Sequence, residues 1–171
     1  MIIHRYILDR VYIKIYQYLK NMNEQILIAS DHAGYKLKNS LINLIGKNIL
    51  MDLGTDSEDS VDYPDFSIKV VKKILHNPLQ MGILICGSGI GMSISANRHK
   101  GIRAGICYTP EMAELSRKHN NINILVLPGR FIDAKIAKLC IDNFLKTPFE
   151  GKRHKRRIDK IDKWLNCMKQ I

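Results

Sequence analysis

The chain has 171 residues, of which 46% are hydrophobic, and this length suits one globular domain with a substantial core. No apolar run approaches the ~18–20 residues of a membrane-spanning helix, so we expect no membrane partner. The formal net charge of +11 is concentrated in KRHKRR at 152–157, which suits a phosphate contact, a nucleic-acid contact or a solvated helix face.

The cysteines are scattered along the chain without CxxC or Cys/His ligand spacing. They stand at Cys86, Cys107, Cys140 and Cys167. This pattern predicts reduced thiols in a cytoplasmic protein, with no metal site and no disulfide framework.

Residues 1–24 differ in character from the rest of the chain. Apolar side chains recur there at roughly helical spacing. Charged residues such as Arg5 and Asp9 stand among them, so the segment lacks the continuous apolar centre that a secretory signal needs. The segment suits either a basic amphipathic arm or an extension upstream of the working start. We favour the extension, because Met22 stands just before the first convincing strand, and expect residues 25–171 to form a single domain.

From Gln25 onward, short apolar strands alternate with amphipathic helices. The strands are expected at residues 25–30, 48–54, 82–86, 102–108 and 123–129. The helices are expected at 35–46, 65–75, 89–98, 111–120 and 133–146, followed by a basic tail helix. Thr109 predicts an N-cap, with Pro110 at the first helical position. The apolar runs lack alternation, which predicts an α/β, three-layer, doubly wound sandwich with a mostly parallel five-stranded sheet and a C-terminal helix.

The loops that follow the first three strands carry polar residues. They read DHAG at 31–34, TDSEDSVDYP at 55–64 and CGSGIG at 86–91. In such a sheet, ligands bind beyond the carboxyl ends of the strands, so we expect these loops to converge on one edge. RKHNN at 117–121 has no obvious place in this arrangement.

The glycine loop after the third strand suits an anion, although it could be an ordinary tight turn. It only begins a dinucleotide fingerprint, since Met92 and Ser93 stand where a third glycine is needed, and no Walker A sequence occurs. Where a strand turns into a helix, unpaired backbone N–H groups point outward, and glycines let a ligand oxygen approach them. An oxyanion such as an enolate would gain about 3 kcal/mol from one preorganised donor.

Several side chains beside these loops are candidates for chemistry. Cys86 stands where the local field favours a thiolate, as base or nucleophile, but it could also be a small buried hydrophobe. His32 and His119 lie in polar contexts and suit acid–base work or a structural role, and Asp31 suits a sugar hydroxyl or a helix cap. Three arginines suit a phosphate or a solvated surface: Arg130, Arg153 and Arg157.

The ordered motifs of residues 25–160 resemble those of ribose-5-phosphate isomerase type B, a family that also includes galactose-6-phosphate isomerase subunits. The motifs are DHAGYKLK, DYPDF, GILICGSGIGMSISANR, GIRAG, LSRKHNN and FEGKRHKRRI. The resemblance implies a metal-free aldose–ketose isomerase that needs no cofactor and acts on a five-carbon sugar phosphate through an enediolate. Some members carry a glutamate base one position after the glycine loop; Met92 stands there, which places this chain with the cysteine users.

The resemblance also implies roles for individual residues. Cys86 would be the base, His119 would assist ring opening beside Asn120, and Asp31 and Tyr63 would face sugar hydroxyls. The anion hole would comprise Gly87, Ser88, Gly89, Ile90 and Gly91, with the Ser88 hydroxyl near the reacting oxygens. The phosphate would be held by His32, Arg130, Arg153 and Arg157.

Family members share active sites between subunits, so a homodimer or homotetramer is expected, in which His119 and Arg130 serve the neighbour's site. The apolar face of the tail helix suits such an interface through Ile158, Ile161, Trp164 and Leu165. A sugar phosphate is thus the expected partner, rather than nucleic acid or a membrane. A six-carbon sugar phosphate remains open as the substrate, as does a non-catalytic module that binds phosphate or RNA through the basic tail.

Overall fold

The computed structural model describes residues 25–167 of the chain. Its five strands form one sheet in the order β2-β1-β3-β5-β4, and every neighbouring pair is parallel. The strands are β1 (Ile26–Ser30), β2 (Leu50–Asp52), β3 (Gly82–Cys86), β4 (Ala104–Ile106) and β5 (Ile124–Pro128). The predicted parallel α/β architecture is therefore confirmed.

The sheet is buried on both faces, as its unalternating apolar strands predict. All residues of the central strands β1, β3 and β5 are buried. The edge strands β2 and β4 are shorter than the sequence predicts. The strand β2 ends at Asp52, although hydrogen bonds to β1 continue through Leu53, Gly54 and Thr55.

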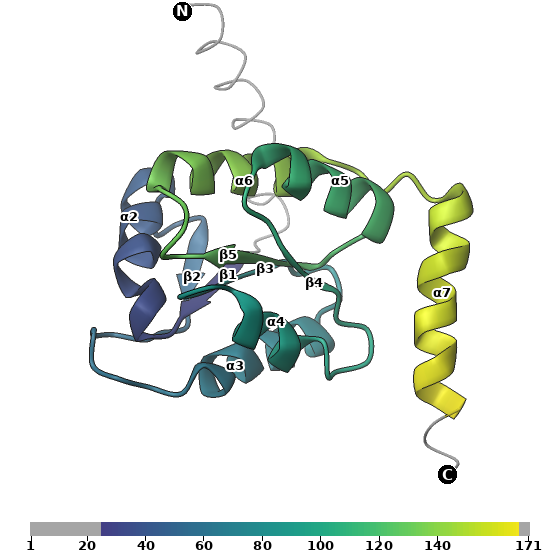
Figure 1. Cartoon of the computed structure of the whole chain (residues 1–171), viewed down its shortest axis with the longest axis horizontal. Helices are drawn as coiled ribbons and strands as arrows, with labels where there is room; N and C mark the ends of the chain where they lie inside the picture. Colours follow the sequence, from purple (N-terminus) through teal and green to yellow (C-terminus); the bar gives the residue numbers. More distant parts are fainter. Residues whose placement is uncertain (1–24, 168–171) are drawn as a thin grey trace, which may run out of the picture.

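Helices cover the two faces in separate layers (Figure 1). On one face α2 (Tyr35–Ile45), α5 (Pro110–Asn120) and α6 (Ala134–Lys146) enclose one apolar cluster. On the other, α3 (Tyr63–His76) and α4 (Ile90–Ala96) enclose a second. A 3-10 turn, η1 (His32–Gly34), leads from β1 into α2.

The helix starts follow the expected capping chemistry. Thr109 Oγ1 accepts a hydrogen bond from the Met112 N–H at 3.3 Å, and Pro110 is the first residue of α5, which confirms both predictions. α3 begins at Tyr63, two residues earlier than expected. Its Pro64 lies within the first turn, where the missing N–H has no helical partner to lose.

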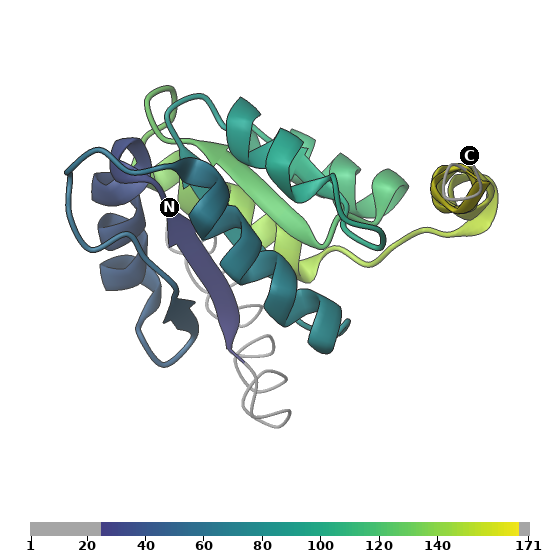
Figure 2. The same cartoon turned by 90° about the horizontal axis from the view of Figure 1, so that it is seen from below.

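The last helix, α7 (Lys152–Cys167), stands apart from the three layers. Figures 1 and 2 both place it clear of the sheet, beyond α5, at the end of an extended connection. Its buried residues include His154 and Ile158. The side chains of Trp164 and Leu165, and the extension expected at residues 1–24, lie outside the described part of the chain. Among the helices within residues 25–167, none is long and apolar enough to span a bilayer.

Candidate active site

Three strand ends meet at the carboxyl edge of the sheet. The Asp31 N–H donates to the Ile85 carbonyl at 3.2 Å, and the Gly129 N–H donates to the Cys86 carbonyl at 2.8 Å. These bonds join the chain segments that leave β1, β3 and β5. The expected convergence is therefore present for the loops after β1 and β3, and the loop after β2 joins them through the Thr55 N–H, which donates to the Ser30 carbonyl at 2.8 Å.

Cys86 ends β3 at the base of the glycine loop, with 4% of its surface exposed. Its Sγ accepts a hydrogen bond from the Gly89 N–H at 3.2 Å. Gly89 has a φ of 81°, so this tight return of the chain needs glycine. The backbone after Cys86 thus curls around the sulfur. The Gly89 N–H therefore provides the Cys86 sulfur with one backbone hydrogen-bond donor.

Ser88 and Tyr63 form the outer wall of the same loop. Ser88 Oγ accepts from the Ile90 N–H at 3.3 Å, and the exposed Ile90 opens α4. A Cβ at Gly91 would lie 2.7 Å from Cζ of Tyr63. The tyrosine ring therefore lies directly against the loop, and it can do so because residue 91 is glycine.

Asp31 and His32 lie on the adjoining loop after β1. Asp31 is 6% exposed, and its Oδ1 accepts from the Gly34 N–H at 3.0 Å. Burial raises the pKa of the Asp31 carboxyl, although this N–H and the charges of His32 and Arg130 oppose the rise. His32 Nδ1 accepts from the Val61 N–H at 3.2 Å, which leaves Nε2 to carry the proton of the neutral ring.

The buried Asp31 carboxyl makes a prediction about the pH dependence of stability. Because its pKa is higher in the folded state, the folded chain binds more protons than the unfolded chain just above the ordinary Asp pKa. Stability therefore falls as the pH rises through that window. Asp31→Asn keeps an oxygen for the Gly34 N–H and removes the titration. We expect its free energy of unfolding to exceed that of wild type at neutral pH.

Urea unfolding between about pH 3 and pH 7 tests this prediction. The free energy of unfolding of Asp31→Asn should exceed that of wild type by an amount that grows as the pH rises. Parallel curves for the two proteins would contradict it.

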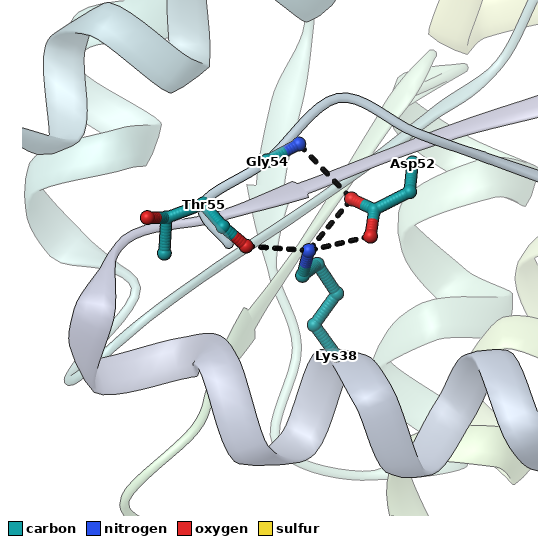
Figure 3. A network of polar contacts seen from close by, with 4 residues as sticks. All are labelled: Lys38, Asp52, Gly54 and Thr55. Carbon is teal, nitrogen blue, oxygen red and sulfur yellow. Dashed lines mark hydrogen bonds and ion pairs between the residues drawn. The ribbon is translucent and has the colours of Figure 1, made fainter. Parts of the chain in front are cut away.

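Lys38 on α2 holds the loop after β2, which leads towards Val61 and Tyr63 (Figure 3). Its fully buried Nζ lies 2.7 and 2.6 Å from the two carboxylate oxygens of Asp52 and 2.7 Å from the Thr55 carbonyl. Asp52 Oδ1 also accepts from the Gly54 N–H at 3.0 Å. All three ammonium protons therefore have acceptors, and the start of the loop is fixed.

Replacing Lys38 with Met should destabilise the fold by about 2–3 kcal/mol. Removing one partner of a fully buried ion pair destabilises a fold by more than this. Here the loss is smaller because the Asp52 side chain is 37% exposed and can be hydrated in the variant. Urea unfolding measures the loss. Lys36→Met is the matched control, because Lys36 lies on the same helix as Lys38 and its Nζ also pairs with a carboxylate, that of Glu58 at 2.9 Å, but its side chain is 81% exposed. The free energy of unfolding of this variant should stay within about 0.5 kcal/mol of wild type. Equal losses in the two variants would refute this assignment.

Arg130 lies at the same edge as Cys86. A Cβ at Gly87 would lie 3.4 Å from both Cδ and Nε of Arg130, and the Arg130 N–H donates to the Gly87 carbonyl at 3.1 Å. This placement brings the Arg130 side chain to its own chain's glycine loop, whereas the family resemblance led us to expect it at a neighbouring subunit's site. It follows β5, whose carboxyl end lies beside that of β3, so its side chain is held at its own chain's loop.

His119 lies elsewhere in the same chain. It is near the end of α5, three residues before Ile122 leads into β5, and therefore on the amino side of the sheet. Its ring stacks on that of His154 with centroids 4.3 Å apart and planes 4° apart. Its Nε2 lies 3.9 Å from Glu150 Oε2. Asn120, exposed, is the next residue of α5.

The beginning of α7 supplies the other half of this cluster. Arg153 Nε donates to His154 Nε2 at 3.3 Å, and Arg157 is exposed one turn further along the helix. Burial lowers the pKa of His154, and the charges of His119 and Arg153 act in the same direction. Within one chain the candidate residues therefore lie in two separate groups. The first, which we call the cysteine half-site, comprises Asp31, His32, Tyr63, residues 86–91 and Arg130; the second, the histidine half-site, comprises His119, Asn120, Glu150, Arg153, His154 and Arg157.

Sequence reasoning missed Glu150 and His154. The ligand atoms of His119, Glu150 and His154 lie within 4.8 Å of one another, a spacing at which a metal ion could be considered. Two stacked rings, however, direct their in-plane lone pairs side by side rather than at a common point. The arrangement therefore suits a hydrogen-bonded acid–base group better than a chelate. The signal in the sequence was slight: one histidine within the basic run KRHKRR.

Comparisons with known proteins agree with these motifs. The family model described as Ribose/Galactose Isomerase matches residues 26–161. Ribose-5-phosphate isomerase B of Escherichia coli is 37% identical over 140 residues, which cover 81% of this chain and 94% of the relative.

Solved structures show the same fold. A ribose 5-phosphate isomerase from Thermotoga maritima has 59% sequence identity and a TM-score of 0.78, covering 81% of this chain and 97% of the other. Ribose-5-phosphate isomerase B from Mycoplasma genitalium, solved with bound ribulose-5-phosphate, has 40% identity and a TM-score of 0.78, covering 83% and 96%. The chain therefore belongs to the ribose/galactose isomerase family, as its motifs indicated, and it is an isomerase.

Proposed function

We propose that this protein interconverts ribose 5-phosphate and ribulose 5-phosphate through an enediolate, with Cys86 as the base. The observation that carries the proposal is the buried Cys86 sulfur, enclosed by the loop whose Gly89 N–H points at it. A base and backbone donors in one place are what proton transfer next to a carbonyl requires. The relative solved with ribulose-5-phosphate supports the choice of a five-carbon substrate.

In this mechanism His119 transfers a proton at the ring oxygen, and the sugar opens to its aldehyde form, with Asn120 beside it. The Cys86 thiolate then removes the proton from C2. The resulting thiol, whose proton exchanges with the solvent, donates a proton to C1, while the proton of the C2 hydroxyl passes to the former carbonyl oxygen. Electron density moves into the carbonyl oxygen, which becomes an enediolate oxygen. Backbone N–H groups of residues 87–91 and the Ser88 hydroxyl stabilise that oxygen as its charge grows.

The rest of the substrate is held by groups away from the reacting carbons. Asp31 and Tyr63 face sugar hydroxyls, and the phosphate is gripped by His32, Arg130, Arg153 and Arg157. A dianion clamped at one end of a sugar keeps C1 and C2 in register with the base. The basic residues of α7 then serve the phosphate of the substrate, and no nucleic acid is needed to explain them. No metal or cofactor takes part.

We further propose that each working site combines the cysteine half-site of one subunit with the histidine half-site of another. The cysteine half-site lies at the carboxyl edge of the sheet, whereas His119 lies on the amino side, and beyond its contact with α5 the helix α7 stands clear of its own chain's layers. Apolar side chains are exposed on α4 and, across the sheet, on α5, and either helix could pack against a second copy: Ile90, Ile94, Met112 and Leu115. A homodimer or homotetramer follows. The free thiols of Cys86, Cys107 and Cys140 fit the cytoplasm as its location.

The direct test is conversion of ribose 5-phosphate in D₂O, with and without a chelator. The proposal predicts turnover that the chelator leaves unchanged, and deuterium at C1 of the ribulose 5-phosphate. Conversion without any deuterium would point to hydride transfer instead of an enediolate. A higher kcat/KM for allose 6-phosphate or galactose 6-phosphate would move the assignment to a six-carbon substrate. Binding of sugar phosphates without turnover of any would leave a phosphate-binding module.

A further inference from the structure

A second polar cavity lies at the edge of the sheet opposite Cys86. It has a volume of about 410 Å³ and is bounded by the segments that lead into β3, β4 and β5 and by the residues around the end of α6. The polar and charged residues that line it are Gln80, Arg103, Arg117, Asn121, Asn123 and Lys146. The lining within the described part of the chain contains three cationic side chains and no carboxylate.

Hydrogen bonds to Asn121 hold Arg103 and Arg117 in place. Arg103 Nε donates to the Asn121 carbonyl at 2.8 Å, and Arg117 Nη1 donates to Asn121 Oδ1 at 2.9 Å. Asn121 is the C-cap of α5 and has a φ of 46°. Asn123 joins the same frame, because its Oδ1 accepts from the Arg103 N–H at 2.8 Å. Both guanidinium groups are therefore oriented before any ligand arrives, so little side-chain entropy is lost on binding.

The positive charge of this cluster is not neutralised locally. Both guanidinium groups are half-buried, and among the side chains that the structure describes neither forms an ion pair within 4 Å. Arg117 Nε is buried without a hydrogen-bond acceptor. Burial lowers the pKa of both groups; the Arg103 charge lowers that of Arg117 further, whereas Asp162 on α7 raises that of Arg103. Two like charges without a paired carboxylate are what an anion would stabilise.

We propose that this cavity is a binding site for a small phosphate-bearing anion, separate from the isomerase site. Guanidinium forks match phosphate oxygens in pairs, and the side-chain amides of Asn121 and Asn123 lie beside them. A water molecule takes about 30 Å³ of liquid volume, so the cavity has room for more than a free phosphate ion. A phosphate ester with a short carbon chain fits the same chemistry. Lys146, exposed at the rim, adds a third positive charge.

The test is a titration of the ¹⁵N-labelled full chain with inorganic phosphate at constant ionic strength, followed by NMR. The signals to follow are Nε–Hε of Arg103 and Arg117 and the side-chain amides of Asn121 and Asn123. We expect them to shift saturably. A second titration with glycerol 3-phosphate distinguishes an ester from the free ion by which of the two binds more tightly.

Variants separate the cavity from the isomerase site, where phosphate also binds under the proposed function. Arg103→Met should weaken the response of Arg117 and Asn123 about tenfold, the value of one charge-assisted hydrogen bond. Arg98→Met is the matched control, since Arg98 is exposed outside the cavity, and it should leave the response unchanged. Arg130→Met, which disables the isomerase site, should also leave it unchanged.

Two results would overturn the proposal: the absence of any saturable shift at Arg117 in the wild-type protein, or equal affinities in wild type and Arg103→Met. If Arg103→Met fails to fold, Lys146→Met takes its place, because the exposed Lys146 carries none of the contacts to Asn121. An unchanged affinity there would then count against the site. The readout is local to the cavity, so a protein without isomerase activity could still pass this test, and an active one could fail it.

Discussion

Replacing Cys86 with alanine is expected to lower kcat for isomerisation by about 10²–10⁴-fold, the range that removing a general base produces. The sulfur is the one titratable group on the glycine loop at residues 86–91, so no other side chain of this loop can act as the base in its place. Contacts to the phosphate and hydroxyls do not involve Sγ. The Kd for ribose 5-phosphate, measured by calorimetry, should therefore change only slightly.

The matched control for this variant is Cys107→Ala. Cys107 is also a buried thiol at the end of a strand, but it faces Ser116 on α5 at 3.6 Å rather than the glycine loop. Burial raises the pKa of its thiol, with the Ser116 hydrogen bond opposing the rise, so it ionises less readily than a free thiol. Its loss should leave kcat close to that of wild type. Substantial turnover in Cys86→Ala would remove the cysteine from the mechanism and turn attention to the Asp31 carboxylate.

The sequence predicted the sheet and the cysteine half-site because both depend on local patterns. Apolar runs without alternation imply a sheet covered on both faces, and parallel topology then brings the loops after β1 and β3 to one edge. This is why Asp31, His32 and the glycine loop lie where they were expected. Arg130 follows the same rule, and its assignment to a neighbouring subunit came from the family resemblance rather than from the strand order.

The remaining features depend on contacts between distant parts of the chain. Nothing in YKLKNS indicates that Lys38 is buried while Lys36 is 81% exposed, because that difference is set by where the loop at 52–55 passes. The stack of His119 on His154 likewise requires the path of the segment between α6 and α7. The cavity lined by Arg103 and Arg117, at the edge of the sheet opposite Cys86, was missed for the same reason. Its two arginines belong to separate motifs, GIRAG and LSRKHNN, and only the Asn121 cap brings them together.

Mixing two inactive variants is expected to restore activity, and this is the sharpest test of a shared site. Cys86→Ala lacks the base but keeps the histidine half-site, and His119→Ala keeps the cysteine half-site. When subunits of the two are unfolded together and refolded at equal amounts, half of the dimers contain one of each. Each such dimer has one site with both residues and one with neither. Recovery should approach about one quarter of the wild-type rate, starting from almost none.

A second pair of variants provides the control. Cys86 and Arg130 lie in the same half-site of one chain, since Arg130 is held against Gly87. Mixing Cys86→Ala with Arg130→Ala therefore produces no site that contains both Cys86 and Arg130. Activity should stay at the level of the separate variants. Recovery in this pair would return Arg130 to the neighbouring subunit. No recovery in the His119 pair would mean that one chain closes its own site, which requires α7 and the end of α5 to move to the carboxyl edge of the sheet. The two pairs together thus assign Cys86, His119 and Arg130 to subunits, because a shared site can be rescued only across the boundary that divides it.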